Sequence, residues 1–320
     1  MAAPKPLSFD REFTAAAAAM AEAGASIPQL PAGDVEGRRK FFEQFFSSRS
    51  SMIPSAPSVT KQEHQIEADD GSTLLLTEFR PNSAASTASP AAFYIHGGGM
   101  YLGSVPGFAS SIALKAEALC LPIFAIGYRL APEHPHPTPV NDCYAGLTWL
   151  HSHAEEVGVD VTRIMIYGES AGGGLAAGVA LMARDRKLDP PLAFQMLIYP
   201  MLDDRNQKPI PTIEPHAMWK CDDNITGWGA LLGKAAGSDE VVEGHEYAAP
   251  SRAKSLKGLP PTYIERLFVR HTTVEAGVQV EFHLYPGLPH GFEMTGAKTS
   301  IVKGVMANRQ RVYDEFRRGV

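Results

Sequence analysis

The stretch 166-IYGESAGGG-174 joins an apolar run, residues 163–167, to a run rich in alanine, glycine and leucine, residues 175–186. The pattern predicts a strand that turns sharply into a helix, with Ser170 at the turn. It matches G-x-S-x-G, the nucleophile elbow, in which a strained serine has small neighbours so that strand and helix can approach each other. A glycine-rich turn with a chance serine is the alternative interpretation.

Backbone NH groups near this turn form a predicted oxyanion hole. The NH of Ala171 is expected at the N-terminus of the helix, without an intrahelical partner and at the positive end of the dipole. A second stretch, 96-HGGG-99, also follows an apolar strand, and its glycines let a substrate carbonyl approach the main chain. Ser170 is therefore the predicted nucleophile, and Gly97, Gly98 and Ala171 are the predicted donors to the oxyanion.

Strand and helix patterns alternate through the middle of the chain. The expected strands are residues 92–95, 123–126, 163–167 and 193–198, and the expected helices between them are residues 108–119, 140–151 and 175–186. This alternation predicts an α/β fold with a mostly parallel sheet and helices on both faces. The Asp70-Gly71 step between residues 64–68 and 72–79 predicts an antiparallel hairpin at the start of the sheet.

Four motifs together resemble the hormone-sensitive-lipase branch of the α/β-hydrolases. They are HGGG at 96–99, YRLAPEHP at 128–135, GESAGG at 168–173 and LPHGF at 288–292. The resemblance runs from about residue 79 to the C-terminus, and it implies an α/β-hydrolase fold, a helical cap and a Ser/acid/His triad that hydrolyses carboxylic esters. We interpret the chain as a single α/β-hydrolase domain, residues 1–320, with a cap from residues 1–50 and 201–259.

The two expected cap segments have helical and aromatic features. Residues 13–23 and 34–47 predict two leading helices, the second with Asp34 as its N-cap, and residues 225–232 predict a helix capped by Asp223 or Asn224. Several aromatic residues could line a substrate pocket, although plain packing is the alternative. They are Phe41, Phe42, Phe45, Phe46, Trp219 and Trp228.

His290 follows the last expected strand, residues 281–285, where the hydrolase fold delivers its general base. The acid between serine and histidine is harder to find. In the family resembled, a G-x-x-D segment after the penultimate strand carries the triad aspartate, but here no aspartate occurs between Asp239 and Asp314. We interpret this as an internal deletion, after which the remaining residues still suffice for a parallel crossover, so the sheet is expected to survive.

Glu265 is the candidate replacement for the acid, because it falls at the end of the strand, residues 260–264, that precedes the acid loop. Glu275 belongs to the shortened crossover, and Glu281 opens the final strand. The alternative is an empty acid position, which would cost on the order of 10⁴ in turnover, as in serine proteases.

Composition excludes several classes of function. The 320 residues are 44% hydrophobic, enough for one large core, and the net charge of −6 argues against a phosphate-binding surface and hence a nucleic-acid partner. Three cysteines lack paired or metal-ligand spacing, and no apolar run reaches the length of a membrane span. We therefore expect a cytoplasmic protein without cofactor or metal, and the sequence leaves its oligomeric state open.

The loop at 128–137 contains two histidines and a glutamate. For this loop we prefer a role in bracing the oxyanion turn over a metal site.

The resulting prediction is a serine carboxylesterase that acts on a small-molecule ester with a short acyl chain. The resemblance implies a bulky apolar alcohol, and the family includes enzymes that deacetylate polyketides, so a role in secondary metabolism is one expectation. A ligand-binding protein on a hydrolase scaffold, or an enzyme weakened by its missing acid, is the alternative.

Overall fold

The computed structural model describes residues 8–22, 30–49, 53–84, 88–212, 214, 217–240, 242–266 and 277–320. These residues form one sheet of eight strands in the order β1-β2-β4-β3-β5-β6-β7-β8. The strands are β1 (Val59–Glu67), β2 (Thr73–Pro81), β3 (Ser89–Ile95), β4 (Ile123–Ile126), β5 (Val159–Glu169), β6 (Phe194–Ile198), β7 (Thr262–Arg266) and β8 (Val280–Leu284). All pairs from β4 to β8 are parallel, so the predicted fold class is confirmed.

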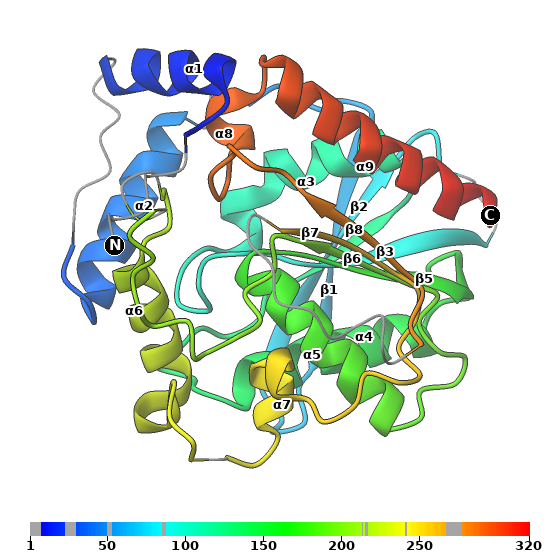
Figure 1. The fold of residues 1–320 in the computed structure, drawn as a ribbon. Helices are drawn as coiled ribbons and strands as arrows, with labels where there is room; N and C mark the ends of the chain where they lie inside the picture. Colours follow the sequence, from blue (N-terminus) through cyan, green and yellow to red (C-terminus); the bar gives the residue numbers. More distant parts are fainter. Residues whose placement is uncertain are drawn as a thin grey trace.

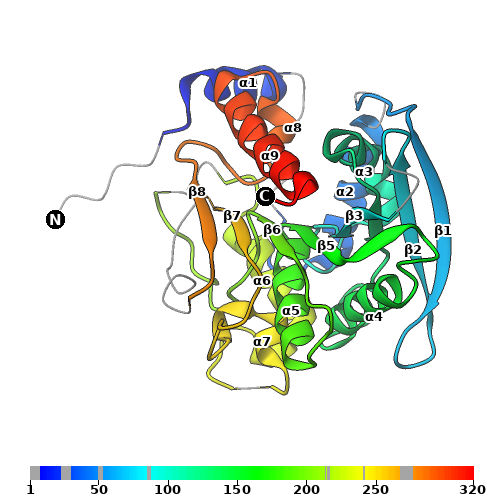
Figure 2. The same cartoon turned by 90° about the vertical axis from the view of Figure 1, so that its right-hand side faces the viewer.

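Helices cover both faces of the sheet (Figure 1, Figure 2). One face carries α3 (Val105–Leu119) and α9 (Ser300–Arg318), and the other carries α4 (Thr138–Ser152) and α5 (Ala171–Asp185). The central strand β3 is buried along its whole length, because successive side chains enter the two cores alternately. Phe93 packs with α4 and α5, for example, whereas its neighbour Tyr94 packs with α3 and α9.

The antiparallel start of the sheet confirms the hairpin expected from Asp70-Gly71. β1 pairs with β2 around this turn, and the Asp70 carboxylate accepts a hydrogen bond from the Ser72 NH at 3.0 Å. Gly71 has φ +79°, a left-handed conformation that glycine adopts without steric cost. β2 then pairs antiparallel with β4.

The far edge of the sheet also forms as expected. β7 pairs in parallel with β8, in a register that runs from Thr262 opposite Val280 to Arg266 opposite Leu284. This pairing confirms the expectation that the sheet is complete at this edge. Residues 267–276, which include Glu275, lie outside the described residues.

The expected cap segments contribute α1 (Arg11–Glu22), α2 (Val35–Arg49), α6 (Cys221–Leu232) and α7 (His245–Ala248). α2 and α6 lie side by side in Figure 1, and Arg38 on α2 forms an ion pair with Asp223 on α6 at 2.8 Å. Asp34 accepts the Gly37 NH at 2.8 Å, which confirms it as the cap of α2. A short helix, α8 (Glu293–Gly296), precedes α9.

The expected start of α6 was wrong. The helix begins at Cys221, and its N-cap is Lys220 rather than Asp223 or Asn224. Asp223 instead occupies the third helical position and accepts the Lys220 NH at 2.7 Å, as the acidic member of a capping box. Across the described residues, no helix is both long and apolar enough to cross a bilayer.

Candidate active site

Ser170 lies at the junction of β5 and α5 with φ 57° and ψ −121°, a strained conformation for a residue with a side chain. Neighbouring backbone holds it there, since its NH donates to the Ile198 carbonyl at 2.9 Å. A Cβ on Gly172 would lie 2.1 Å from the carbonyl oxygen of Ile95. The glycines therefore allow α5 to begin at Ala171, which agrees with the expected place of Ala171 at the helix N-terminus, although the expected helical range began only at residue 175.

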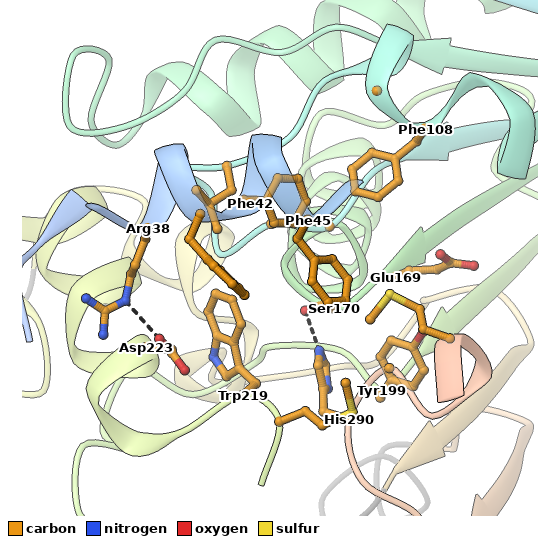
Figure 3. A pocket seen from close by; sticks show the side chains of 18 of the residues that line it. Arg38, Phe42, Phe45, Phe108, Glu169, Ser170, Tyr199, Trp219, Asp223 and His290 are labelled. Carbon is orange, nitrogen blue, oxygen red and sulfur yellow. Dashed lines mark hydrogen bonds and ion pairs between the residues drawn. The ribbon is translucent and has the colours of Figure 1, made fainter. Parts of the chain in front are cut away.

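His290 lies opposite this serine, in the segment between β8 and α8. Its Nε2 atom is 2.8 Å from Ser170 Oγ (Figure 3). Burial lowers the pKa of His290 to about 4, and the nearby charge of Glu169 opposes this effect only in part. The imidazole is thus neutral at pH 7 and can accept a proton from the hydroxyl.

The HGGG loop borders the same serine. A Cβ on Gly97 would lie 2.9 Å from the Glu169 carbonyl oxygen, and Gly98 has φ +119°, a conformation that side chains disfavour. Within the described residues, the NH groups of Gly97, Gly98 and Ala171 donate to no protein acceptor outside regular helix and strand pairing. The structure therefore brings the three predicted donors to the nucleophile with their NH groups available.

The loop at 128–137 supports the oxyanion loop, as expected. The Tyr128 ring stacks on His96 at a centroid distance of 4.4 Å, and its hydroxyl donates to the His96 carbonyl at 3.0 Å. The Ala131 NH donates to the Met100 carbonyl at 3.0 Å. No group of three or more potential metal ligands occurs in the part of the chain that the structure describes.

Arg39 on α2 joins these two loops. Its Nε donates to the Tyr101 carbonyl at 2.9 Å, and its Nη2 donates to the Ala131 carbonyl at 3.0 Å. An ion pair with Glu133 at 2.6 Å completes the contact. One side chain from the N-terminal region thus fixes the loop that presents Gly97 and Gly98.

The structure does not bring Glu265 to His290. Both Glu265 oxygens bind Arg309, from Nε at 2.9 Å and from Nη2 at 2.6 Å, and the Tyr263 hydroxyl donates to the same carboxylate at 2.6 Å. None of its hydrogen bonds or ion pairs among the described residues involves His290. Side chains alternate along a strand, so Glu265 points to the same face as Tyr263, toward the α3 and α9 layer.

Two cavities meet at Ser170 and His290. One, of about 330 Å³, has a largely aromatic wall, which Figure 3 shows. Its lining includes Phe41, Phe42, Phe45, Phe108, Tyr199 and Trp219. The other, of about 790 Å³, contains Trp219 and Trp228 together with polar residues such as Asn206 and Lys208. The aromatic residues expected in a pocket are therefore found there, except that the Phe46 side chain lies outside the described residues.

A family model described as the alpha/beta hydrolase fold matches residues 92–294, more than half of the chain. This chain belongs to the α/β-hydrolase family. The match begins within β3 and ends just after His290, so it contains every residue of the predicted site.

Several proteins similar to this chain are named as esterases or ester hydrolases. Esterase LipI of Mycobacterium tuberculosis is 33% identical over 226 residues, which cover 66% of this chain and 68% of that protein. Ethyl acetate hydrolase of Pseudomonas putida is 30% identical over 246 residues, 71% of this chain and 74% of the other. The solved structure of a bacterial heroin esterase aligns with a TM-score of 0.81 and 32% identity, and covers 97% of this chain and 98% of the other.

Sequence reasoning missed two residues at the site of this α/β-hydrolase. Glu169 lines the aromatic cavity, pairs with Lys115 at 3.3 Å and accepts a hydrogen bond from the Tyr167 hydroxyl at 3.0 Å. Burial acts to raise the pKa of Glu169, but the positive charges of Lys115 and Arg309 have a larger opposite effect. Its pKa is therefore below the usual value, and the carboxylate is ionised. Tyr199 is the second residue that the sequence analysis missed. Its position directly after β6 was the one sequence signal that it could lie at the site.

Proposed function

We propose that this α/β-hydrolase is a carboxylic ester hydrolase that works through an acyl-serine intermediate. The main support is the 2.8 Å distance between Ser170 Oγ and His290 Nε2. The serine also has the strained backbone conformation of a nucleophile elbow. Ser170 attacks the ester carbonyl while His290 takes its proton and passes it to the leaving alcohol. Water then attacks the acyl-serine, with His290 as base, and the acid is released.

The oxyanion that forms in both steps is stabilised by the NH groups of Gly97, Gly98 and Ala171 in this proposal. Among the described residues these groups have no acceptor outside regular pairing, and close packing holds the backbone of Gly97 and Gly98 in place. Donors fixed before reaction need no reorganisation when the charge develops, and one such donor contributes about 10² to 10³ in kcat in a serine protease.

We further propose that the segment carrying the triad aspartate of the family is missing and that Glu265 does not replace it. The engagement of Glu265 with Arg309 and Tyr263 supports this, and so does the fact that no described carboxylate bonds to His290. We expect an enzyme that is labelled at Ser170 by an active-site probe but turns over slowly, because no described residue forms a hydrogen bond with His290 Nδ1 to fix the imidazole tautomer.

The proposed substrate is an ester with a short acyl chain and a bulky apolar alcohol, and a secondary metabolite that carries an acetyl group fits this class. The names of two relatives, ethyl acetate hydrolase and bacterial heroin esterase, support short acyl groups. Two cavities of unequal size, both lined by Ser170, offer separate space for the acyl and alcohol groups. We interpret residues 1–50 and 201–259 as the cap over them.

A fluorophosphonate probe and p-nitrophenyl acetate test the proposal together. The unaltered protein should be labelled at Ser170 and should release nitrophenol, whereas Ser170→Ala should do neither and keep its circular dichroism spectrum. Hydrolysis that persists in folded Ser170→Ala would exclude the serine mechanism.

The second candidate function is ligand binding on a hydrolase scaffold. It is favoured by one observation, the ion pair that directs Glu265 away from His290. Absence of labelling at Ser170, combined with tight binding of an uncleaved ester, would support this function over catalysis.

A further inference from the structure

Tyr199 occupies a strained position that is tied to the nucleophile. It has φ +34°, which is unfavourable for an aromatic residue, directly after β6. The residues on either side of it explain how this conformation persists. The Ile198 carbonyl accepts the Ser170 NH, and the Met201 NH donates to the Ser170 carbonyl, both at 2.9 Å. The backbone around Tyr199 is therefore fixed relative to Ser170.

The Tyr199 ring contacts the general base of the proposed reaction. Its centroid lies 4.6 Å from that of His290 at an interplanar angle of 62°, an edge-to-face contact that Figure 3 shows beside Ser170. The Tyr199 ring makes a second edge-to-face contact with Phe292, two residues after His290, at a centroid distance of 6.1 Å. These contacts restrict rotation of the imidazole, whose only hydrogen bond among the described residues is the one to Ser170.

The Tyr199 hydroxyl is anchored in turn. It donates to Glu293 Oε2 at 3.1 Å, and Glu293 Oε1 lies 2.6 Å from Arg309 Nη2. Arg309 is 2% exposed and also binds Glu265, so this anchor is connected to α9 and β7. Burial raises the pKa of Tyr199 well above its usual value, which keeps the hydroxyl protonated and able to donate.

We propose that Tyr199 is a positioning residue that holds the His290 imidazole toward Ser170, and that Glu293 holds Tyr199 in place. The inference rests on the proposed esterase function. A triad acid orients the imidazole through Nδ1, whereas this arrangement orients it through contact with a ring that is itself hydrogen-bonded. The effect is on geometry alone, and no bond to substrate is required of Tyr199.

The experiment compares Tyr199→Phe, Glu293→Met and the double variant on p-nitrophenyl acetate. Each single change removes the 3.1 Å hydrogen bond, and Glu293→Met leaves Arg309 paired with Glu265. We expect each to lower kcat by about tenfold with KM unchanged, because the ring still lines the cavity while the imidazole is held less firmly. The double variant should be no slower than either single variant, since all three lose the same bond.

Tyr247→Phe is the matched control. It removes a tyrosine hydrogen bond to Asp185 of 3.0 Å between α7 and α5, away from the site, and its kcat should equal that of the parent. A kcat within twofold of the parent in Tyr199→Phe, or losses that multiply in the double variant, would overturn the inference. Should Tyr199→Phe fail to fold, Glu293→Met decides in the same way. A parent that neither labels nor hydrolyses would instead refute the esterase function itself.

Discussion

Arg309 on α9 and Glu265 on β7 form an ion pair with two hydrogen bonds. Both residues are buried, with relative exposures of 2% and 1%. Arg309 also binds Glu293, so one cation serves two carboxylates. Removing a single partner from a buried pair leaves desolvated charge without compensation, which is far more costly than losing a surface ion pair.

Glu265→Gln should therefore act on stability. We expect a loss of roughly 3 kcal/mol in the free energy of unfolding, near the lower end for buried pairs because Arg309 keeps Glu293. Urea unfolding measures this, and the labelling rate at Ser170 in the folded protein should stay unchanged. A large fall in kcat with unaltered stability would instead identify Glu265 as the triad acid.

On the acidic side of its pH profile, kcat/KM should fall only at an unusually low pH. The pKa of His290 is lowered to about 4 by burial, and only the neutral imidazole can accept the Ser170 proton. Activity on an activated ester is thus expected to be level from pH 8 to about pH 5 and to fall through a midpoint near 4. A midpoint near that of an ordinary histidine would contradict this environment for His290.

Stability must be followed in the same experiment. The unfolded chain binds the His290 proton at higher pH than the folded protein does, so stability declines as the pH falls from about 6.5 to 4. Circular dichroism at each pH separates loss of fold from protonation of the base.

Two glycine substitutions should have opposite effects on stability. Gly172→Ala places a Cβ 2.1 Å from the Ile95 carbonyl oxygen and should cost about 2 kcal/mol or more, with loss of labelling at Ser170. Gly229→Ala, at an exposed position of α6 with no atom within 4 Å of the added Cβ, should stabilise by about 0.5–1 kcal/mol. Equal stabilities of the two variants would show that α5 can shift away from β3.

Esters of different acyl length test the proposed substrate class. The aromatic cavity of about 330 Å³ beside Ser170 favours compact groups, so acetate and butyrate esters should have the highest kcat/KM. A preference for long-chain triglycerides over these esters would contradict the proposal.

The sequence predicts best those parts of the fold whose backbone tolerates few residue types. Ser170 between glycines and the HGGG loop have conformations or close contacts that larger residues disfavour, so their composition indicates their structure. The hairpin at Asp70-Gly71 and the cap at Asp34 depend on equally local chemistry, and both are confirmed.

Features that depend on distant packing were harder to predict. Glu265 falls at the expected strand end, but the direction of its side chain depends on which face β7 presents to α9, and a short strand gives no sign of that. The role inferred for Tyr199 depends on contacts with residues nearly a hundred positions away.

Arg39 contacts both the HGGG loop and the 128–137 loop. The part of the chain that builds the candidate site is therefore longer than the region shared with the family. α2 lies outside residues 92–294, yet it supplies Phe41, Phe42 and Phe45 to the cavity wall and fixes the carbonyls of Tyr101 and Ala131. A fragment trimmed to the shared region would keep Ser170 and His290 but lose one wall of the cavity and the brace on the HGGG loop. The proposed catalytic residues therefore lie within the shared region, whereas the cavity wall combines residues of that region, such as Phe108 and Trp219, with α2 residues that can diverge separately.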